Sequence, residues 1–231
     1  MILTAHQPVY LPWLGLFHKI AMADVFVSYD DVQYCPKDYQ NRNKIWTLQG
    51  PLWLTVPVRH NRWGPGSKIC DVQILQRQLW LRKHWKSILY SYRKAAYWNE
   101  YGPALQRRFY ASYYSCKLAP LNDDMLRWFL DVLGIKVEFK RASELELKGE
   151  KSARVLDMCQ KLGADTYIFG ALGRDYADVA AFEKAGIKVI LQDYQHPVYS
   201  QFGGDFVPNL SIIDLLFHHG PKAKQILMGQ S

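Results

Sequence analysis

The sequence predicts an α/β protein in which a mostly parallel sheet is flanked by helices. Short apolar runs alternate with amphipathic stretches near the start of the chain and again after about residue 135, as in folds where strands and helices follow one another. Between these parts, residues from about 78 to 134 have a helical pattern. The 231 residues, 49% of them hydrophobic, can bury a sizeable core. We expect a single domain over residues 1–231 with a helical insertion at about 78–134.

The first 30 residues predict a strand, a helix and a second strand. Residues 2–5 form a short apolar run. The apolar residues from 14 to 20 share one helical face, and Pro12 suits the start of that helix. Residues 25–29 form the second apolar run. Polar residues that follow it would lie at the carboxyl end of a strand, where open α/β sheets bind their ligands.

The middle of the chain predicts a hairpin and then helices. Residues 53–58 alternate like a strand, and residues 69–75 are expected to pair with them across a turn at Gly64-Pro65-Gly66. From 79 to about 133 the pattern is helical, with breaks expected near Gly102-Pro103 and Ala119-Pro120.

The last part alternates strands and helices, which favours parallel pairing. The expected strands are residues 137–139, 166–169 and 188–191, and the expected helices are residues 151–162, 178–184 and 210–217. Ser211 or Asn209 could cap the last helix.

The net charge of +8 favours acidic partners such as phosphates. Basic and aromatic residues interleave between 77 and 117, a pattern typical either of a groove that stacks single-stranded nucleic acid or of helices with one apolar and one basic, solvated face. We favour the second interpretation and expect a small-molecule substrate rather than nucleic acid.

Cysteine usage and hydropathy indicate a cytoplasmic protein. The four cysteines contain no CxxC pair, so they form neither a zinc ribbon nor a dithiol redox motif, and we expect reduced thiols. No apolar run approaches the ~18 residues of a membrane span. The N-terminus lacks the basic region and cleavage site of a signal peptide.

Polar residues gather where the first strands end. Asp30 and Asp31 follow the second strand and, if extended, point to opposite sides, so one of them could serve as a general base or bind a hydroxyl. His6 and His196 lie beside turns that contain proline and are the two histidines that we place near a site. Gln7 and Tyr10 could orient an acceptor. None of the histidines has HxH or HExxH spacing, and there is no GxSxG motif, so neither a metal site nor a serine nucleophile is predicted.

Two segments could bind an anion. Arg42 lies between Asn41 and Asn43, and a guanidinium binds phosphate or carboxylate through two hydrogen bonds. A loop after the strand at 166–169 could expose backbone N–H groups and add a positive charge. The candidate binding residues of this loop are Gly170, Gly173, Arg174 and Tyr176. The other candidate binding residues are Gln33, Lys37 and Tyr199.

These segments resemble the WbqC-like protein family of bacteria, almost from end to end. The resemblance is carried by residues 7–15, 23–33, 40–43, 164–170 and 208–216. It implies a protein encoded among genes for O-antigen and related surface polysaccharides, with a transferase role on sugar precursors. The positions that match the family pattern are Gln7, Pro8, Tyr10, Pro12, Gly15, Asp30, Asp31, Gln33, Lys37, Asn41, Arg42, Asn43, Ser211 and Asp214. His6 and the loop Gly170-Ala171-Leu172-Gly173-Arg174 depart from it, because relatives tend to have an apolar residue and a Gly-Gly-rich form there.

A more distant resemblance is to nucleotidyltransferases that carry a HIGH motif, in which a first strand enters a histidine-containing turn. The second histidine of the motif is missing from His6-Gln7-Pro8-Val9-Tyr10. The serine-rich segment of that class has a faint likeness in Leu210-Ser211-Ile212-Ile213. This resemblance implies a nucleotidyltransferase-like (HUP-type) topology.

Three hypotheses follow. The first is a transferase that moves an acyl or aminoacyl group to a nucleotide-linked amino sugar in surface polysaccharide biosynthesis, with acyl-CoA as one candidate donor. The second is nucleotidyl or adenylyl transfer with ATP and Mg²⁺. The third is a module without catalytic activity that binds nucleic acid or polysaccharide.

Overall fold

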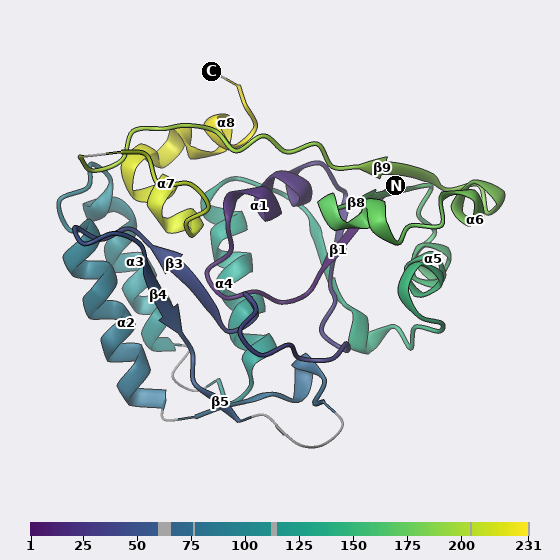
Figure 1. Ribbon diagram of the computed structural model, residues 1–231, viewed down its shortest axis with the longest axis horizontal. Helices are drawn as coiled ribbons and strands as arrows, with labels where there is room; N and C mark the ends of the chain where they lie inside the picture. Colours follow the sequence, from purple (N-terminus) through teal and green to yellow (C-terminus); the bar gives the residue numbers. More distant parts are fainter. Residues whose placement is uncertain (60–65, 76, 112–114, 204, 231) are drawn as a thin grey trace.

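β1 is the central strand of a five-stranded sheet in the computed structural model, which describes residues 1–59, 66–75, 77–111, 115–203 and 205–230 (Figure 1). The sheet order is β7-β2-β1-β8-β9, and all of its pairs are parallel. The predicted α/β class is confirmed. The strands are β1 (Ile2–His6), β2 (Val25–Ser28), β7 (Glu138–Arg141), β8 (Thr166–Phe169) and β9 (Lys188–Leu191).

Helices cover both faces of this sheet, which a parallel sheet requires because its strands are buried on both sides. α1 (Leu14–Ala21) and α4 (Leu118–Val132) pack on one face, where Phe17 meets Phe129 with ring centroids 6.1 Å apart. α5 (Lys151–Leu162) and α6 (Val179–Lys184) pack on the other face. Strand residues alternate between the two cores, so Leu3 faces α5 while Phe26 faces α1.

The remaining helices lie beside the sheet and share its larger core. They are α2 (Arg77–Tyr92), α3 (Trp98–Ala111), α7 (Ile212–His219) and α8 (Ala223–Leu227). The break predicted near Gly102-Pro103 is wrong, because both residues lie inside α3, whereas the break predicted near Ala119-Pro120 is confirmed, because α4 begins at Leu118. Pro120 sits in the first turn of α4, where no helical N–H is needed, and the missing side chain of Gly102 makes room for the Trp98 ring. The prediction that Pro12 opens α1 is also wrong, because that helix begins at Leu14.

The amphipathic interpretation of the basic segment is supported by α2. Trp80, Trp85 and Tyr92 are buried, while the basic residues between them are exposed. The exposed basic residues include Arg82, Lys83 and Lys86.

Two small antiparallel ribbons replace the single predicted hairpin. β4 (Leu52–Thr55) pairs with β3 (Arg42–Ile45), a strand that the polar sequence Asn41-Arg42-Asn43 did not suggest. β5 (Val58–Arg59) pairs with β6 (Gln73–Ile74), which follows a 3-10 turn at Ile69–Asp71. Of the predicted turn, residues 64 and 65 lie outside the described part of the chain.

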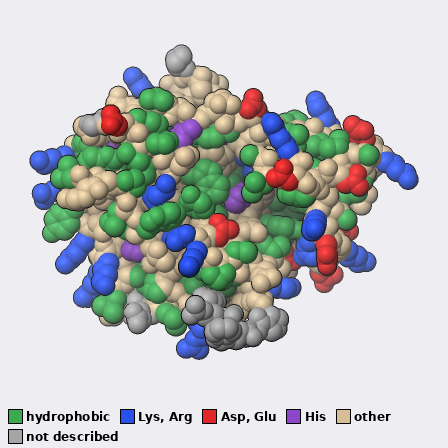
Figure 2. All heavy atoms as spheres, in the orientation of Figure 1, with side chains coloured by type: hydrophobic (Ala, Val, Ile, Leu, Met, Phe, Trp, Pro, Cys, Tyr) green, Lys and Arg blue, Asp and Glu red, His purple; other side chains and the backbone are tan. Residues whose placement is uncertain are grey.

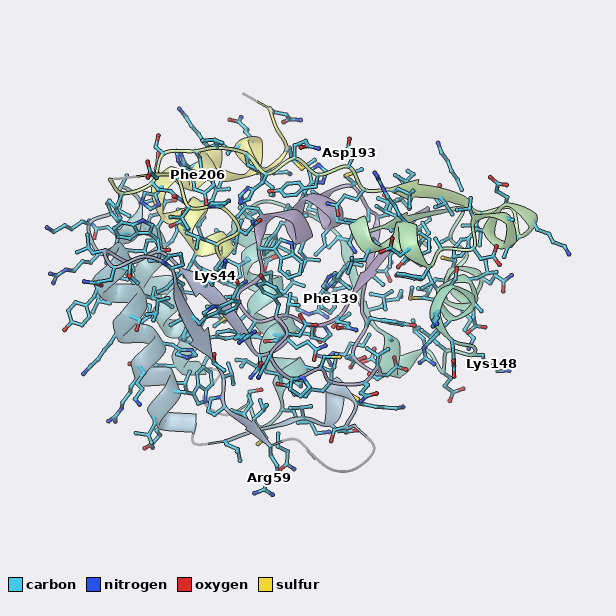
Figure 3. All side chains as sticks on the ribbon, in the orientation of Figure 1. Lys44, Arg59, Phe139, Lys148, Asp193 and Phe206 are labelled. Atoms are coloured by element: carbon cyan, nitrogen blue, oxygen red, sulfur yellow. The ribbon has the colours of Figure 1, made fainter. Side chains whose placement is uncertain are left out.

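The segment 192–211 joins the sheet to the side helices, and its described residues form no strand or α-helix. It leaves β9, passes α1 and reaches α7, and Figure 3 labels Asp193 near its start and Phe206 near its end. Its last residue caps α7, as predicted, because the Ser211 hydroxyl accepts a hydrogen bond from Ile213 N–H. The Ser211 N–H also donates to Lys44 O at 2.9 Å.

Asp214 is the polar centre of the side helices and is fully buried. Its carboxylate accepts hydrogen bonds from Tyr92 at 2.9 Å, Tyr199 at 2.9 Å and Gln201 at 2.8 Å. Burial raises the pKa of this carboxyl, although His218 and the three donors oppose the rise. The network ties the end of α2 to α7 and to the 192–211 segment.

None of the helices in the described part of the chain is long and apolar enough to cross a membrane. The division of the chain into one domain with a helical insertion stays a prediction, as does the nucleotidyltransferase-like topology.

We expect Asp214→Ala to lower the free energy of unfolding by about 3 kcal/mol, because it leaves three buried donors without an acceptor. Asp124→Ala is the matched control. Asp124 pairs with Arg108 at 3.1 Å with both side chains well exposed, so its loss should cost less than about 1 kcal/mol. Urea unfolding measures both values, and equal losses would contradict a structural role for the Asp214 network.

Candidate functional site

The carboxyl ends of β1, β2 and β8 meet at one edge of the sheet. If the five strands are numbered by their order in the chain, their order across the sheet is 3-2-1-4-5. The chain therefore leaves β1 toward β2 on one side and leaves β8 toward β9 on the other, so the order reverses between β1 and β8. In open α/β sheets, ligands bind outside the carboxyl ends of the strands at such a switch point. The residues that follow the three strands here are Gln7, Tyr29 and Gly170. This edge is the candidate site.

His6 is the last residue of β1, and its imidazole is held as a neutral base. Its Nδ1 lies 2.8 Å from the carbonyl oxygen of Gln7, which can only accept, so Nδ1 carries the proton and Nε2 keeps a lone pair. Burial and the charge of Lys19 lower the pKa of His6 to about 3, against the raising effect of the Gln7 carbonyl. Its ring packs edge-on against Trp13, with centroids 5.3 Å apart.

Lys19 reaches the same edge from α1. Its side chain is 4% exposed, and Nζ donates to Ala5 O at 2.9 Å. Burial lowers the pKa of Lys19 to about 8, so the amine is mostly charged at pH 7. Among the described residues no acidic side chain pairs with it. A buried charge without a counter-ion is costly, which makes an anionic ligand the natural partner for this amine.

Gly170, the first residue after β8, leaves space at this edge of the sheet because it has no side chain. A Cβ placed on Gly170 would lie 3.6 Å from Lys19 Nζ, so a larger side chain would crowd the space beside the amine. Gly173 serves packing instead, because a Cβ there would lie 2.4 Å from the Phe169 side chain. Arg174 and Tyr176 are exposed.

Asp30 and Asp31 point to different partners, as adjacent residues of an extended segment should. Both Asp30 oxygens accept hydrogen bonds from Ser143, at 2.9 Å from its N–H and 2.8 Å from its hydroxyl. Asp31 Oδ2 pairs with Arg154 of α5, and its Oδ1 is buried with no partner among the described residues. Asp31 therefore keeps an oxygen for a ligand, and Asp30 fixes the turn after β7.

Figure 2 shows that this face of the molecule is hollowed near its middle, where hydrophobic side chains and a histidine lie, with lysine or arginine side chains at the rim. Lys44 of β3, labelled in Figure 3, lies on the side of the hollow toward α2.

The WbqC-like protein family model matches residues 7–226. The chain belongs to the WbqC-like family. It is 34% identical over 222 residues to "Uncharacterized protein Rv1507c" of Mycobacterium tuberculosis, an alignment that covers 96% of this chain and 95% of that protein. No solved structure matches the chain. The predicted family is thus confirmed.

In this WbqC-like chain, the polar segment around Arg42 is largely engaged within the protein. Asn41 donates to Val56 O at 2.8 Å and Asn43 to Leu11 O at 2.6 Å, and both side chains are buried. Arg42 donates to Lys37 O and lies over the Trp53 ring, 4.4 Å from its centroid. These contacts indicate that the segment shapes the loop around the hollow.

Gln7 and Tyr10 also contact other parts of the chain. Gln7 Oε1 accepts from Gln40 at 2.6 Å, which leaves its amide group beside His6. Tyr10 is fully buried, and its hydroxyl lies 2.8 Å from His84 Nδ1, away from the hollow. Gln33 is exposed and packs against Gly66.

The other candidate residues of this WbqC-like chain form other clusters. Ser211, Asp214 and Tyr199 belong to the network of the side helices described above. His196 Nε2 accepts a hydrogen bond from Asn209 N–H at 2.7 Å, which holds Asn209 in its left-handed conformation at φ 58°. Burial lowers the pKa of His196, in keeping with this acceptor role. The structure therefore brings His6, Gln7 and Gly170 together, whereas the observed hydrogen bond of His196 is a structural one to Asn209.

The sequence prediction missed Lys19 and Arg154. The signal for Lys19 was a charged residue between Phe17 and Ile20, on the apolar face of a predicted helix. Arg154 carried no such signal, because α5 has many charged residues and only the fold brings it to Asp31.

We expect Lys19→Met to raise the free energy of unfolding by about 2 kcal/mol at pH 7, because it removes an unpaired buried charge. The unfolded state binds more protons than the folded state at pH values between the folded pKa of Lys19, about 8, and the usual lysine pKa of 10.5. Wild-type stability therefore rises with pH in that window, and the difference between the two proteins should shrink there.

Urea unfolding between pH 7 and 10.5 measures this difference. Lys224→Met is the matched control, because Lys224 also donates to a single backbone carbonyl, Gly134 O at 2.8 Å, but lies exposed. A Lys19→Met protein less stable than wild type at pH 7 would show that the charge is already compensated within the fold.

Proposed function

We propose that this chain is an enzyme that transfers an acyl or aminoacyl group to the amine of a nucleotide-linked amino sugar, at the carboxyl edge of the sheet. The observation that carries the proposal is the buried Lys19 amine, which lies at the switch point and has no counter-ion among the residues that the structure describes. The phosphates of a nucleotide would supply that charge. The overall charge of +8 would further attract such a substrate.

His6 is the base that this geometry favours over Asp30, whose two oxygens are occupied by Ser143. Its Nε2 lone pair is available to remove a proton from the attacking amine. The low pKa of His6 makes it a weak base in the free protein. A bound phosphate would neutralise the effect of Lys19 and raise this pKa toward the range useful in catalysis.

The transfer step with an acyl-CoA donor is balanced as follows. The amine nitrogen of the sugar attacks the thioester carbonyl and forms the new C–N bond, and the C–S bond breaks with its electron pair on sulfur. The amine proton passes to His6 Nε2 and then to the departing thiolate. Gln7, next to His6, would orient the sugar.

Aromatic rings extend from His6 toward the surface and would suit the sugar. Trp13 lies 5.2 Å from Tyr39, and Tyr39 lies 5.7 Å from Trp53, with all distances between ring centroids. Trp53 is 41% exposed. Amphipathic rings of this kind offer a flat apolar surface to a ligand and keep polar groups at their edges.

The family supports a role in the biosynthesis of O-antigen and other bacterial surface polysaccharides. None of the four cysteines forms a disulfide within the described part of the chain, in keeping with a reducing cytoplasm as the place of the reaction.

Nucleotidyl transfer is the second candidate, because a histidine ends the first strand of a parallel sheet and a buried lysine lies next to it. The two reactions differ in their products. Release of pyrophosphate from ATP in the presence of Mg²⁺ would favour nucleotidyl transfer, and release of free thiol from an acyl-CoA would favour acyl transfer.

We expect Lys19→Met to weaken the binding of inorganic pyrophosphate and of UDP by at least tenfold, because it removes a charge-assisted contact to phosphate. Isothermal titration calorimetry measures both affinities. Lys224→Met should bind like wild type. Unchanged affinity in the Lys19→Met protein would sink the proposed phosphate site.

We expect His6→Asn to lower the turnover of acyl transfer about 100-fold while UDP affinity changes little, because the loss of a general base affects the chemical step. Thiol release from acetyl-CoA with a panel of UDP-linked and dTDP-linked amino sugars measures turnover. His196→Asn is the control and should stay within a few-fold of wild type. Full turnover in the His6→Asn protein would assign the base elsewhere, with Asp31 as the next candidate.

A further inference from the structure

A second group of unpaired polar atoms lies at the carboxyl edge, on the α5 side of the sheet. Asp31 follows β2 and pairs through Oδ2 with Arg154, and its side chain is only 9% exposed. Asp31 Oδ1 and Arg154 Nε are both buried, and neither has a hydrogen-bond partner among the described residues. Buried polar atoms are nearly always paired, so one unpaired acceptor and one unpaired donor in the same ion pair point to a missing ligand.

The other contacts of Arg154 fix this pair in place. Its Nη1 donates to Leu147 O at 3.0 Å, and its guanidinium carbon lies 5.8 Å from the centroid of the Tyr29 ring. The Tyr29 N–H donates to His6 O at 2.8 Å, so the Asp31–Arg154 pair is joined through one residue to the strand that carries the proposed base. The pair is therefore part of the candidate site and is held rigidly beside it.

One exposed aromatic side chain, Tyr176, lies close enough to Tyr29 for its charge to affect the pKa of Tyr29. Tyr176 follows the turn at Ala171–Asp175, is 46% exposed and packs its ring edge-on against Phe169. Its exposed ring offers a face on which a planar group of the ligand could stack.

The chemistry of the pair selects a hydroxyl. A hydroxyl group donates one hydrogen bond and accepts others, so it can satisfy Asp31 Oδ1 and Arg154 Nε at the same time. An anion would be repelled by the Asp31 carboxylate, and a cation by Arg154. In sheets of this kind, an acidic residue beyond the second strand binds ribose hydroxyls when the phosphates lie at the first strand.

We propose that Asp31 and Arg154 bind the 2′- and 3′-hydroxyls of a ribonucleoside diphosphate, whose phosphates lie at Lys19 and whose base stacks on Tyr176. This inference rests on the proposed function, because it takes the nucleotide as the ligand of Lys19. It adds the class of nucleotide, namely a ribonucleotide. An ion pair with a purely structural role would give no preference for ribose.

The experiment compares three kinds of probe on the wild-type protein by isothermal titration calorimetry: inorganic pyrophosphate, the four common ribonucleoside diphosphates, and their 2′-deoxy counterparts. We expect at least one ribonucleotide to bind about tenfold more tightly than its 2′-deoxy form, because a hydrogen bond to a charged group is lost. Equal affinities, with pyrophosphate still bound, would overturn the ribose site and leave the phosphate site at Lys19 standing. Failure of every probe to bind, pyrophosphate included, would overturn the proposed function and the ribose site with it.

Asp31→Asn gives a second measurement. The variant should lose most of the preference for ribose and keep its affinity for pyrophosphate. Asp157→Asn is the matched control, because Asp157 also pairs with a basic residue of α5, Lys161 at 3.3 Å. Asp157 is distant from Asp31 in the sequence and has a different ion-pair partner. An undiminished ribose preference in the Asp31→Asn protein would overturn the assignment to Asp31. If this variant does not fold, the comparison of ribose and deoxyribose on the wild type decides alone.

Discussion

The pairing of β1 with both β2 and β8 is the constraint on which the rest of the structure depends. Because all three strands are parallel, their carboxyl ends meet at one edge, and the residues after each strand become neighbours although Gln7 and Gly170 are 163 positions apart. α1 returns from this edge along one face of the sheet and brings Lys19 against Ala5 O. α5 lies on the other face and brings Arg154 to Asp31. The pairing of these strands thus brings together the two parts of the candidate site, Lys19 on one face of the sheet and the Asp31–Arg154 pair on the other.

The site combines groups that cost stability with groups that secure the fold. Lys19 is buried with one hydrogen bond, and Asp31 and Arg154 each keep an unpaired atom. By contrast, Asp30 and Asp214 use both carboxylate oxygens within the protein. Unsatisfied polar atoms in a well-paired interior are the kind of local cost that proteins retain at functional sites.

Sequence patterns predicted the α/β class and the five sheet strands, because apolar runs and alternation report burial directly. They failed where a residue's role depends on a distant partner. Asn41 and Asn43 looked like ligand groups, but they bond the backbone of Val56 and Leu11. Tyr10 bonds His84, which lies 74 positions later, and His196 anchors Asn209. Lys19 was overlooked because a single lysine in a helix normally reaches solvent, and only the fold shows that this one cannot.

The order in which the sheet can form has a consequence for how the chain folds. β8 pairs with β1 only after about 170 residues have been made, and the N-terminus itself bonds Asp165. Until then β1 has one strand neighbour, and its other edge offers unpaired backbone groups to any other extended chain. Contacts of such long sequence separation slow folding and prolong that exposure. During synthesis the N-terminal half is therefore the part of this protein most in need of protection from aggregation, although it carries most of the groups that the finished site uses.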